Sequence, residues 1–360
     1  MCRYIFCIFF FVIATNISVQ AQRVRSVVNG YGHMNYSYFH DFNKNTDAST
    51  SYFELGEHDL FVNTFFNDRI SFLGEFVVRY TKGSPSTFSA SIERARLKFD
   101  YYKNHSIITG KIHTPVNYWN DVYHHGRVFF PSIDRPTSFS YLIPLHNLGI
   151  QFQGQNLGKL NFGYDVVIGN GISATDAFDD NLSPATTVAL HIKPKDNMRI
   201  GASYFYDYLT DASITGVHSG HTTAPSHLHT DKYTGSLHYH LLSQSIAYFG
   251  EKHEFLNEFV YNVTHTDTLG FANNLSNYTY YGYRIKEKHI PYVILDWISI
   301  AENDLYTYHY DLMRYWLGYR HEFSESIVVK AQLGYSHNFL NDSHEPTNML
   351  DFKVQFAYGF

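Results

Sequence analysis

Four histidines crowd one short segment of this chain at spacings of two and three residues. His218 and His221 are followed by His227 and His229, with Ser, Gly and Pro between them. Imidazole nitrogens are common ligands of zinc, nickel and copper, and flexible residues between them let a chain wrap around an ion. The spacing predicts a site for such a metal, while a polar surface loop that has accumulated histidine accounts for the same residues.

A second group of chemically versatile residues lies in the longest insertion of the chain, residues 115–147. Its centre, YWNDVYHHGRVFFPSIDRP at residues 118–136, is too long, aromatic and charged for a simple connection. Charged side chains at the narrow point of a pore decide which ions pass. If the insertion folds into a pore, its candidate filter residues are Asp121, His124, His125, Arg127, Asp134 and Arg135. The alternative is a lid that packs against other surface loops.

Basic residues gather on the segments just before this insertion. Arg94, Arg96 and Lys98 alternate with apolar residues, so a strand here would place all three on one face. Neighbouring segments are expected to add to that face, which gives a cationic wall of Arg79, Arg94, Arg96, Lys98, Lys111 and His113. Such a wall favours anions. The alternative is ordinary pore charge, balanced across the barrel by Asp165, Asp207, Glu258 and Asp296.

Catalytic and cofactor motifs are missing from the sequence. It has no GxSxG or HExxH pattern and no phosphate-binding glycine loop, so we predict no enzymatic activity and no cofactor. The balance of 27 Lys+Arg against 33 Asp+Glu gives a net charge of -6, which argues against a nucleic-acid partner.

The first 21 residues have the pattern of a secretory signal peptide. Arg3 precedes an apolar stretch at residues 4–14, and Val19-Gln20-Ala21 resembles a cleavage site. Both cysteines, Cys2 and Cys7, lie in this segment, so the mature chain would form no disulfide. We therefore expect residues 1–21 to be removed and residues 22–360 to form the exported domain.

The rest of the chain alternates apolar and polar residues with period 2, which is typical of β-strands. In the last segment Phe352, Val354 and Phe356 alternate with Lys353 and Gln355. We predict about 16 strands, with 14 to 18 allowed, separated by alternating short and long connections. They span residues 27–41, 54–66, 70–82, 88–101, 105–114, 148–156, 159–170, 185–194, 197–208, 232–249, 254–265, 277–286, 289–299, 310–322, 326–338 and 348–360.

This pattern predicts an all-β fold, a transmembrane antiparallel β-barrel. Strands of roughly 9–11 residues span a bilayer, with apolar residues toward lipid and polar residues toward the lumen. Short joints such as residues 67–69 and 195–196 would be periplasmic turns, and long ones such as 171–184, 209–231 and 266–276 extracellular loops. Both termini are then expected on the periplasmic side.

Two segments resemble known outer-membrane proteins. The stretch GKIHTPVNYWNDVYHHG, residues 110–126, resembles porins of the phosphate-selective porin O/P kind, and the strand ending in Phe360 resembles the C-terminal assembly signal of Gram-negative outer-membrane barrels. The first resemblance implies a pore-lining strand followed by a loop folded into the lumen. The second implies the barrel-assembly machinery as a partner, and porins are commonly homotrimers.

Together these features predict a porin-like channel in the outer membrane, surrounded by lipid, for passive diffusion of small hydrophilic solutes, with some preference for anions. The alternative is a surface receptor or metal-capture barrel that uses the histidines of residues 218–229.

Overall fold

The computed structural model describes residues 24–42, 48–80, 88–172, 179, 181–210, 235–304, 311–340 and 346–360. The predicted signal peptide and the four histidines His218, His221, His227 and His229 lie outside the described residues. Among the residues that are described, no helix is long and apolar enough to cross a membrane.

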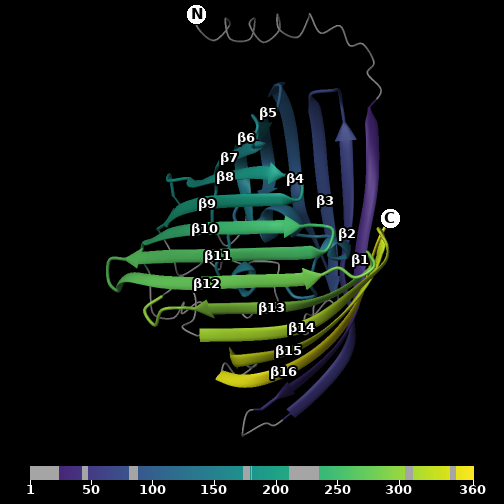
Figure 1. The fold of residues 1–360 in the computed structure, drawn as a ribbon. Coiled ribbons are helices and arrows are strands. Elements are labelled where there is room, and N and C mark those ends of the chain that lie inside the picture. The colour runs from purple at the N-terminus through teal and green to yellow at the C-terminus, as the bar shows by residue number, and fades with distance from the viewer. Residues whose placement is uncertain are drawn as a thin grey trace, which may run out of the picture.

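Sixteen antiparallel strands form one closed barrel, in which each strand pairs with its sequence neighbours and β1 pairs with β16 (Figure 1). The strands are β1 (Arg25–Asp41), β2 (Ala48–Phe65), β3 (Ile70–Tyr80), β4 (Phe88–Tyr102), β5 (His105–His113), β6 (His146–Leu157), β7 (Phe162–Gly169), β8 (Ala185–Lys195), β9 (Met198–Leu209), β10 (Leu237–Phe249), β11 (His253–Thr266), β12 (Gly270–Tyr283), β13 (His289–Ser299), β14 (Asp311–Ser324), β15 (Ile327–Leu340) and β16 (Pro346–Gly359).

The predicted fold class and all sixteen strands are confirmed, but two connections are shorter than expected. The second strand was predicted to begin at residue 54, whereas β2 begins at Ala48. We expected a long loop over residues 266–276, whereas β12 begins at Gly270 and a tight turn joins it to β11. In the first half of β12 the interior position is held by a polar residue. Asn274 faces the interior and donates hydrogen bonds to Asn262 and Asp304 at 2.7 and 2.6 Å. Because this half of β12 lacks apolar alternation, the sequence pattern did not predict it as a strand.

The outer surface of the barrel is apolar, as period-2 alternation predicts. On β16, Phe352 and Phe356 are exposed on the outside, while Asp351 and Gln355 are buried inside. The interior is only partly polar, however. Strands β10 to β14 turn buried residues such as Tyr278, Tyr292 and Trp316 inward, where they form an apolar cluster. Something other than water must cover this part of the wall.

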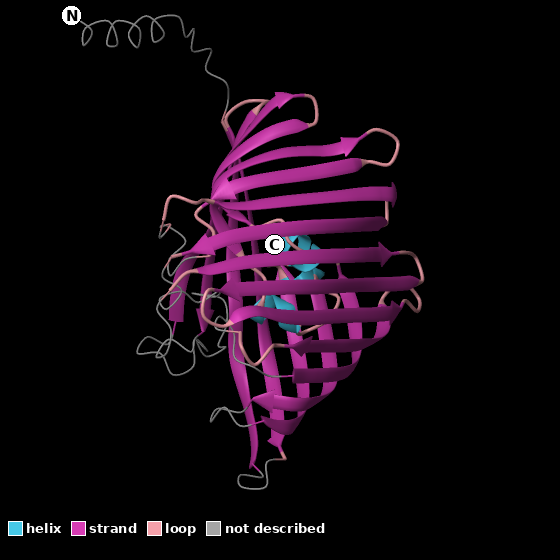
Figure 2. Cartoon of the chain, turned by 90° about the vertical axis from the view of Figure 1, so that its left-hand side faces the viewer, coloured by secondary structure: helices cyan, strands magenta, loops and turns pink. Residues whose placement is uncertain are grey.

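The covering element is the segment between β5 and β6, residues 114–145, which we call the lumen loop. It contains three short helical turns, η1 (Trp119–Tyr123), η2 (Arg127–Phe129) and α2 (Thr137–Tyr141), which lie inside the barrel (Figure 2). Seven of its residues belong to the same apolar cluster as the wall: Val116, Trp119, Phe130, Phe139, Leu142, Ile143 and Leu145. The prediction that this insertion folds into the lumen is therefore confirmed.

Gly110 fixes where β5 leaves β4 and turns toward the lumen loop. Its backbone φ is +118°, and a Cβ at this position would collide with the carbonyl oxygen of Ala95 on β4. A non-glycine residue at such a φ costs about 1–3 kcal/mol. We expect Gly110→Ala to lower the free energy of unfolding by more than about 1 kcal/mol, measured by denaturant titration of the folded barrel. The control Gly201→Ala, at a strand glycine of ordinary φ, should cost less; equal costs would contradict the argument.

Candidate functional site

The two ends of the lumen loop are tied together where it leaves the wall. The backbone N–H of Thr114 donates to the carbonyl of Leu145 at 3.0 Å. Asn120 then donates its side-chain amide to the carbonyls of both Thr114 and Leu145, at 2.7 and 3.2 Å. The π-helical turn η1 therefore folds back over the mouth of the loop, and the rest of the loop crosses the interior.

One side of the lumen loop packs against the apolar wall. The Trp119 ring lies edge-on to Tyr278 of β12 and to Phe130, with ring centroids 5.5 and 5.3 Å apart. Tyr239 of β10 donates its hydroxyl to the carbonyl of Leu142 at 2.6 Å. Because these aromatic side chains are fully buried, the packing provides most of the apolar burial that holds the loop in place.

Acidic residues of the same wall accept hydrogen bonds from the lumen loop. Glu258 accepts from the backbone N–H of Trp119 at 2.7 Å. Asp296 accepts from the backbone N–H and the hydroxyl of Thr137, at 2.8 and 2.6 Å. In the alternative to an anion preference, these two carboxylates would balance basic residues across an open pore. They bind the loop instead, because it reaches the far wall.

On the opposite side, charged residues predicted for the filter form ion pairs. Arg135 makes a two-point contact with Glu57 of β2, at 3.2 and 2.9 Å. Asp134 accepts from Lys353 of β16 at 2.7 and 2.8 Å, and that lysine lowers the pKa of Asp134 despite the opposing effect of burial. The loop is thus anchored to both sides of the barrel.

His125 and Asp121 make further contacts of this kind. Nitrogens of His125 lie 3.7 to 3.8 Å from carboxylate oxygens of Glu57, Asp59 and Glu93. Burial disfavours the charged imidazolium, but the carboxylates outweigh burial and raise the pKa of His125 to about 10. Asp121 pairs with Arg199 of β9 at 2.5 Å. Most predicted filter residues therefore position the loop.

The predicted cationic wall is largely neutralised within the strands that carry it. Arg79 pairs with Glu93 at 2.9 Å, Arg94 with Glu75, and Lys98 with Asp100 at 2.9 Å. A β-bulge in the pairing of β3 with β4 lets Glu93 and Arg94, although adjacent, both reach interior partners. Strict alternation from Arg94 would place Glu93 on the outer face, so Glu93 was not predicted as the partner of Arg79.

Two other members of the predicted cationic wall, Lys111 and Arg96, differ from the three ion-paired residues and from each other. Lys111 pairs with Ala95, and directly paired residues share a face. Lys111 is therefore on the face opposite Arg94 and Arg96, which corrects the expectation that it adds to their charge. Arg96 lies on the interior face and, within the part of the chain that the structure describes, makes neither an ion pair nor a hydrogen bond to another side chain.

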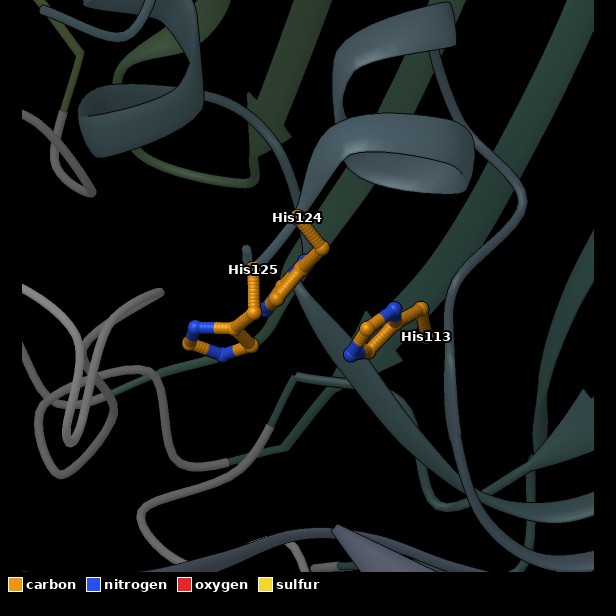
Figure 3. Close-up of side chains that lie close together, drawn as sticks. All are labelled: His113, His124 and His125. Carbon is orange, nitrogen blue, oxygen red and sulfur yellow. The ribbon is translucent and has the colours of Figure 1, made fainter. Parts of the chain in front are cut away.

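Histidines from three segments meet beside Glu93. His113 ends β5, His146 begins β6 and is directly paired with it, and His124 follows η1. The rings of His113 and His124 stack with centroids 3.6 Å apart, and His146 lies 5.0 Å from His124 (Figure 3 shows His113, His124 and His125). The sequence analysis missed His146 and Glu93, because nothing local indicates that they meet. We call Glu93, His113, His124, His125 and His146 the histidine cluster.

No protein-family model and no curated protein matches the chain. Solved structures of similar fold include an anion-selective porin from Comamonas acidovorans, with a TM-score of 0.66 at 9% identity over 94% of this chain and 100% of that one. OmpF of Salmonella typhi has a TM-score of 0.63 at 11% identity, covering 93% and 97%. A trimer form of Vibrio cholerae OmpT has a TM-score of 0.62 at 12% identity, covering 93% and 99%. At these identities the likeness is one of fold.

Proposed function

We propose that this chain is a porin-like channel of the outer membrane through which small hydrophilic solutes diffuse passively. The observation that carries the proposal is a closed sixteen-strand barrel with an apolar outer surface and a loop anchored across its interior. A barrel of this size encloses more space than its wall side chains fill, and a loop inside it sets the width of the passage. We propose no enzymatic role.

The proposed orientation places both termini in the periplasm. Strand β1 begins, and β16 ends, at the barrel end where the tight turn of residues 66–69 joins β2 to β3. Short turns at that end are the pattern of periplasmic turns.

We propose that the barrel-assembly machinery recognises the strand that ends in Phe360. The fold shared with a trimeric OmpT supports a homotrimer, and the resemblance of residues 110–126 supports, as a finer proposal, kinship with phosphate-selective O/P porins.

We further propose that solutes pass between the lumen loop and the polar part of the wall. On that side Arg96 of β4 has Asp121 and Asp165 as acidic neighbours. Asp165 accepts hydrogen bonds from Gln151 and Gln153 at 2.7 and 2.8 Å. Polar groups suit a hydrated path, whereas the wall opposite is packed with aromatic side chains. Among the described residues, Arg96 makes no ion pair or side-chain hydrogen bond, so the proposed preference for anions rests mainly on it.

Reversing the charge of Arg96 tests this assignment. A unit charge 4–8 Å away in water changes an ion's energy by about 0.5–1 kcal/mol, so Arg96→Glu should lower the anion-to-cation permeability ratio at least about threefold. The measurement is the zero-current potential of single channels in a planar bilayer under a salt gradient. Lys159→Glu makes the same charge change on an exposed turn and should have little effect. A conducting Arg96→Glu channel of unchanged selectivity would contradict the anion assignment.

The alternative function, a receptor or metal-capture barrel that uses the histidines of residues 218–229, makes a different prediction. Refolded protein with the heat-modifiable migration of an intact barrel would then show no conductance. That result would overturn the channel proposal.

A further inference from the structure

The histidine cluster places the donor atoms that transition metals prefer at the base of the lumen loop. Ligand atoms of His113, His124 and His125 lie within 4.8 Å of one another, and so do those of Glu93, His124 and His146. The two groups share His124. Because Glu93 belongs to β4, His113 to β5, His146 to β6 and His124 to the loop, one bound ion would join the loop to three strands.

Hydrogen bonds around His124 fix its tautomer. Its Nδ1 lies 2.6 Å from the side-chain oxygen of Asn120. The other atom of the Asn120 amide donates to the carbonyls of Thr114 and Leu145 and is therefore the nitrogen. The atom that faces His124 is the amide oxygen, which can only accept a hydrogen bond. His124 Nδ1 must therefore carry the proton, which leaves a lone pair on Nε2. Metal-binding histidines are held in this way, with one nitrogen donating to a fixed acceptor and the other bound to the ion.

A second observation concerns His113. This side chain is more than nine-tenths buried, and its Nε2 has no hydrogen-bond partner within the described part of the chain. A carboxylate oxygen of Glu75 lies 3.8 Å from it, beyond hydrogen-bond distance. A buried polar nitrogen without a hydrogen bond costs about 1–3 kcal/mol. Coordination of an ion would remove that cost.

The surrounding charges indicate which ions would fit. Glu57, Glu75 and Glu93 are each already paired with arginine. His125 has its two nitrogens 3.7 to 3.8 Å from carboxylate oxygens of Glu57, Asp59 and Glu93, so carboxylates already surround both of its possible ligand atoms. Because the carboxylates are compensated, net negative charge would not hold an ion here, and calcium or magnesium is disfavoured. Affinity would come from imidazole nitrogens, which favour zinc, nickel or copper.

We propose that His113, His124, His146 and Glu93 form a binding site for a borderline divalent metal such as zinc, which fastens the lumen loop to β4, β5 and β6. His146 Nε2 and Glu93 Oε2 are already 3.1 Å apart. Tetrahedral zinc with bonds of about 2.0–2.1 Å separates its ligands by about 3.4 Å. Within each of the two groups the ligand atoms lie no more than 4.8 Å apart, so side-chain rotation must close them by up to about 1.4 Å to reach that separation. His113 joins Glu93 and His146 through the shared His124, and its ring centroid lies 5.4 Å from that of His146. The site does not depend on whether the barrel conducts.

The test is a titration of the refolded full-length barrel with Co²⁺, whose visible absorption bands report coordination, followed by competition with Zn²⁺. We expect one tight equivalent that is lost in His124→Ala and in His146→Ala. Asn120→Ala removes the acceptor that orients His124 together with the amide that donates to Thr114 and Leu145, and it should weaken binding by about 10- to 100-fold. Asn120→Asp keeps the acceptor and should retain most of the binding. Asn120→Ala also provides a test if a ligand variant fails to show heat-modifiable migration.

Two controls separate this site from other histidines. A variant with His218, His221, His227 and His229 all changed to alanine should keep the tight equivalent. His238→Ala should keep it too, because His238 packs against Tyr206 on the outer face of the barrel. Absence of Co²⁺ bands in the parent protein, or bands that survive His124→Ala and His146→Ala, would overturn the proposal. Bands lost only in the fourfold variant would assign the metal to the histidines of residues 218–229 instead.

Discussion

Replacing residues 115–144 by Asn-Gly is expected to raise single-channel conductance severalfold. The backbone N–H of Thr114 already donates to the carbonyl of Leu145 at 3.0 Å, so the two residues are placed to be joined by a two-residue turn, for which Asn-Gly is favoured. All sixteen strands keep their partners, and the barrel should remain closed. Only the loop that crosses the interior is removed. The measurement is conductance of the refolded variant in a planar bilayer.

A single substitution provides the matched comparison for this deletion. Trp119→Ala removes the largest buried side chain of the loop, and loss of a buried tryptophan costs about 3–5 kcal/mol. We expect this variant to keep a mean conductance near that of the parent but to fluctuate more, because the loop is held less firmly. Unchanged conductance of the deletion variant, with intact heat-modifiable migration, would mean that the loop does not set the width of the path.

The second large effect is expected from Glu57→Gln. Glu57 is 8% exposed and faces three cations: Arg135 at 2.9 Å, Arg127 at 3.4 Å and His125 at 3.7 Å. Removing one partner from a buried ion pair costs about 3–5 kcal/mol, since the remaining charges are left uncompensated. The loss should be seen in denaturant unfolding followed by tryptophan fluorescence.

The control for Glu57→Gln lies on the same strand. Glu54 accepts one hydrogen bond, from Asn35 at 2.8 Å, and is only partly buried. Glu54→Gln should therefore cost about 1 kcal/mol or less. Combining Glu57→Gln with Arg135→Gln should recover part of the loss, because the double variant lacks both charges of the pair. Strictly additive losses would show that the two residues do not act as a pair.

The strands and their order could be predicted from the sequence, because in a barrel each strand pairs with its neighbours in the chain. Alternation of Phe352 and Phe356 with polar residues is a local signal, and it holds wherever lipid lies on one side and the interior on the other. The first half of β12, residues 270–276, was missed because its interior residues bind other polar groups and its alternation is weak. The length and aromatic content of residues 115–147 indicated more than a simple connection, and the inward fold was implied by the resemblance of residues 110–126 to porins.

The partners inside the barrel could not be predicted, since they come from strands far apart in the chain. Asp134 and Lys353 are separated by 219 positions and are nevertheless 2.7 Å apart. The apolar residues Tyr278 and Tyr292 gave no sign that a loop covers them rather than water. Alternation placed Glu93 outside, yet with the bulge in the pairing of β3 and β4 it reaches Arg79 and His146.

The sequence by itself therefore determined the barrel and the long insertion after its fifth strand, because these depend on residue periodicity and segment length. Only the tertiary structure decided which charges are neutralised and which histidines meet. The pairing of β5 with β4 and with β6 places the ends of these strands side by side, and the lumen loop brings His124 back to them. Ion pairing and metal coordination act over a few ångströms, and such short distances are set by closure and by register, not by spacing along the chain.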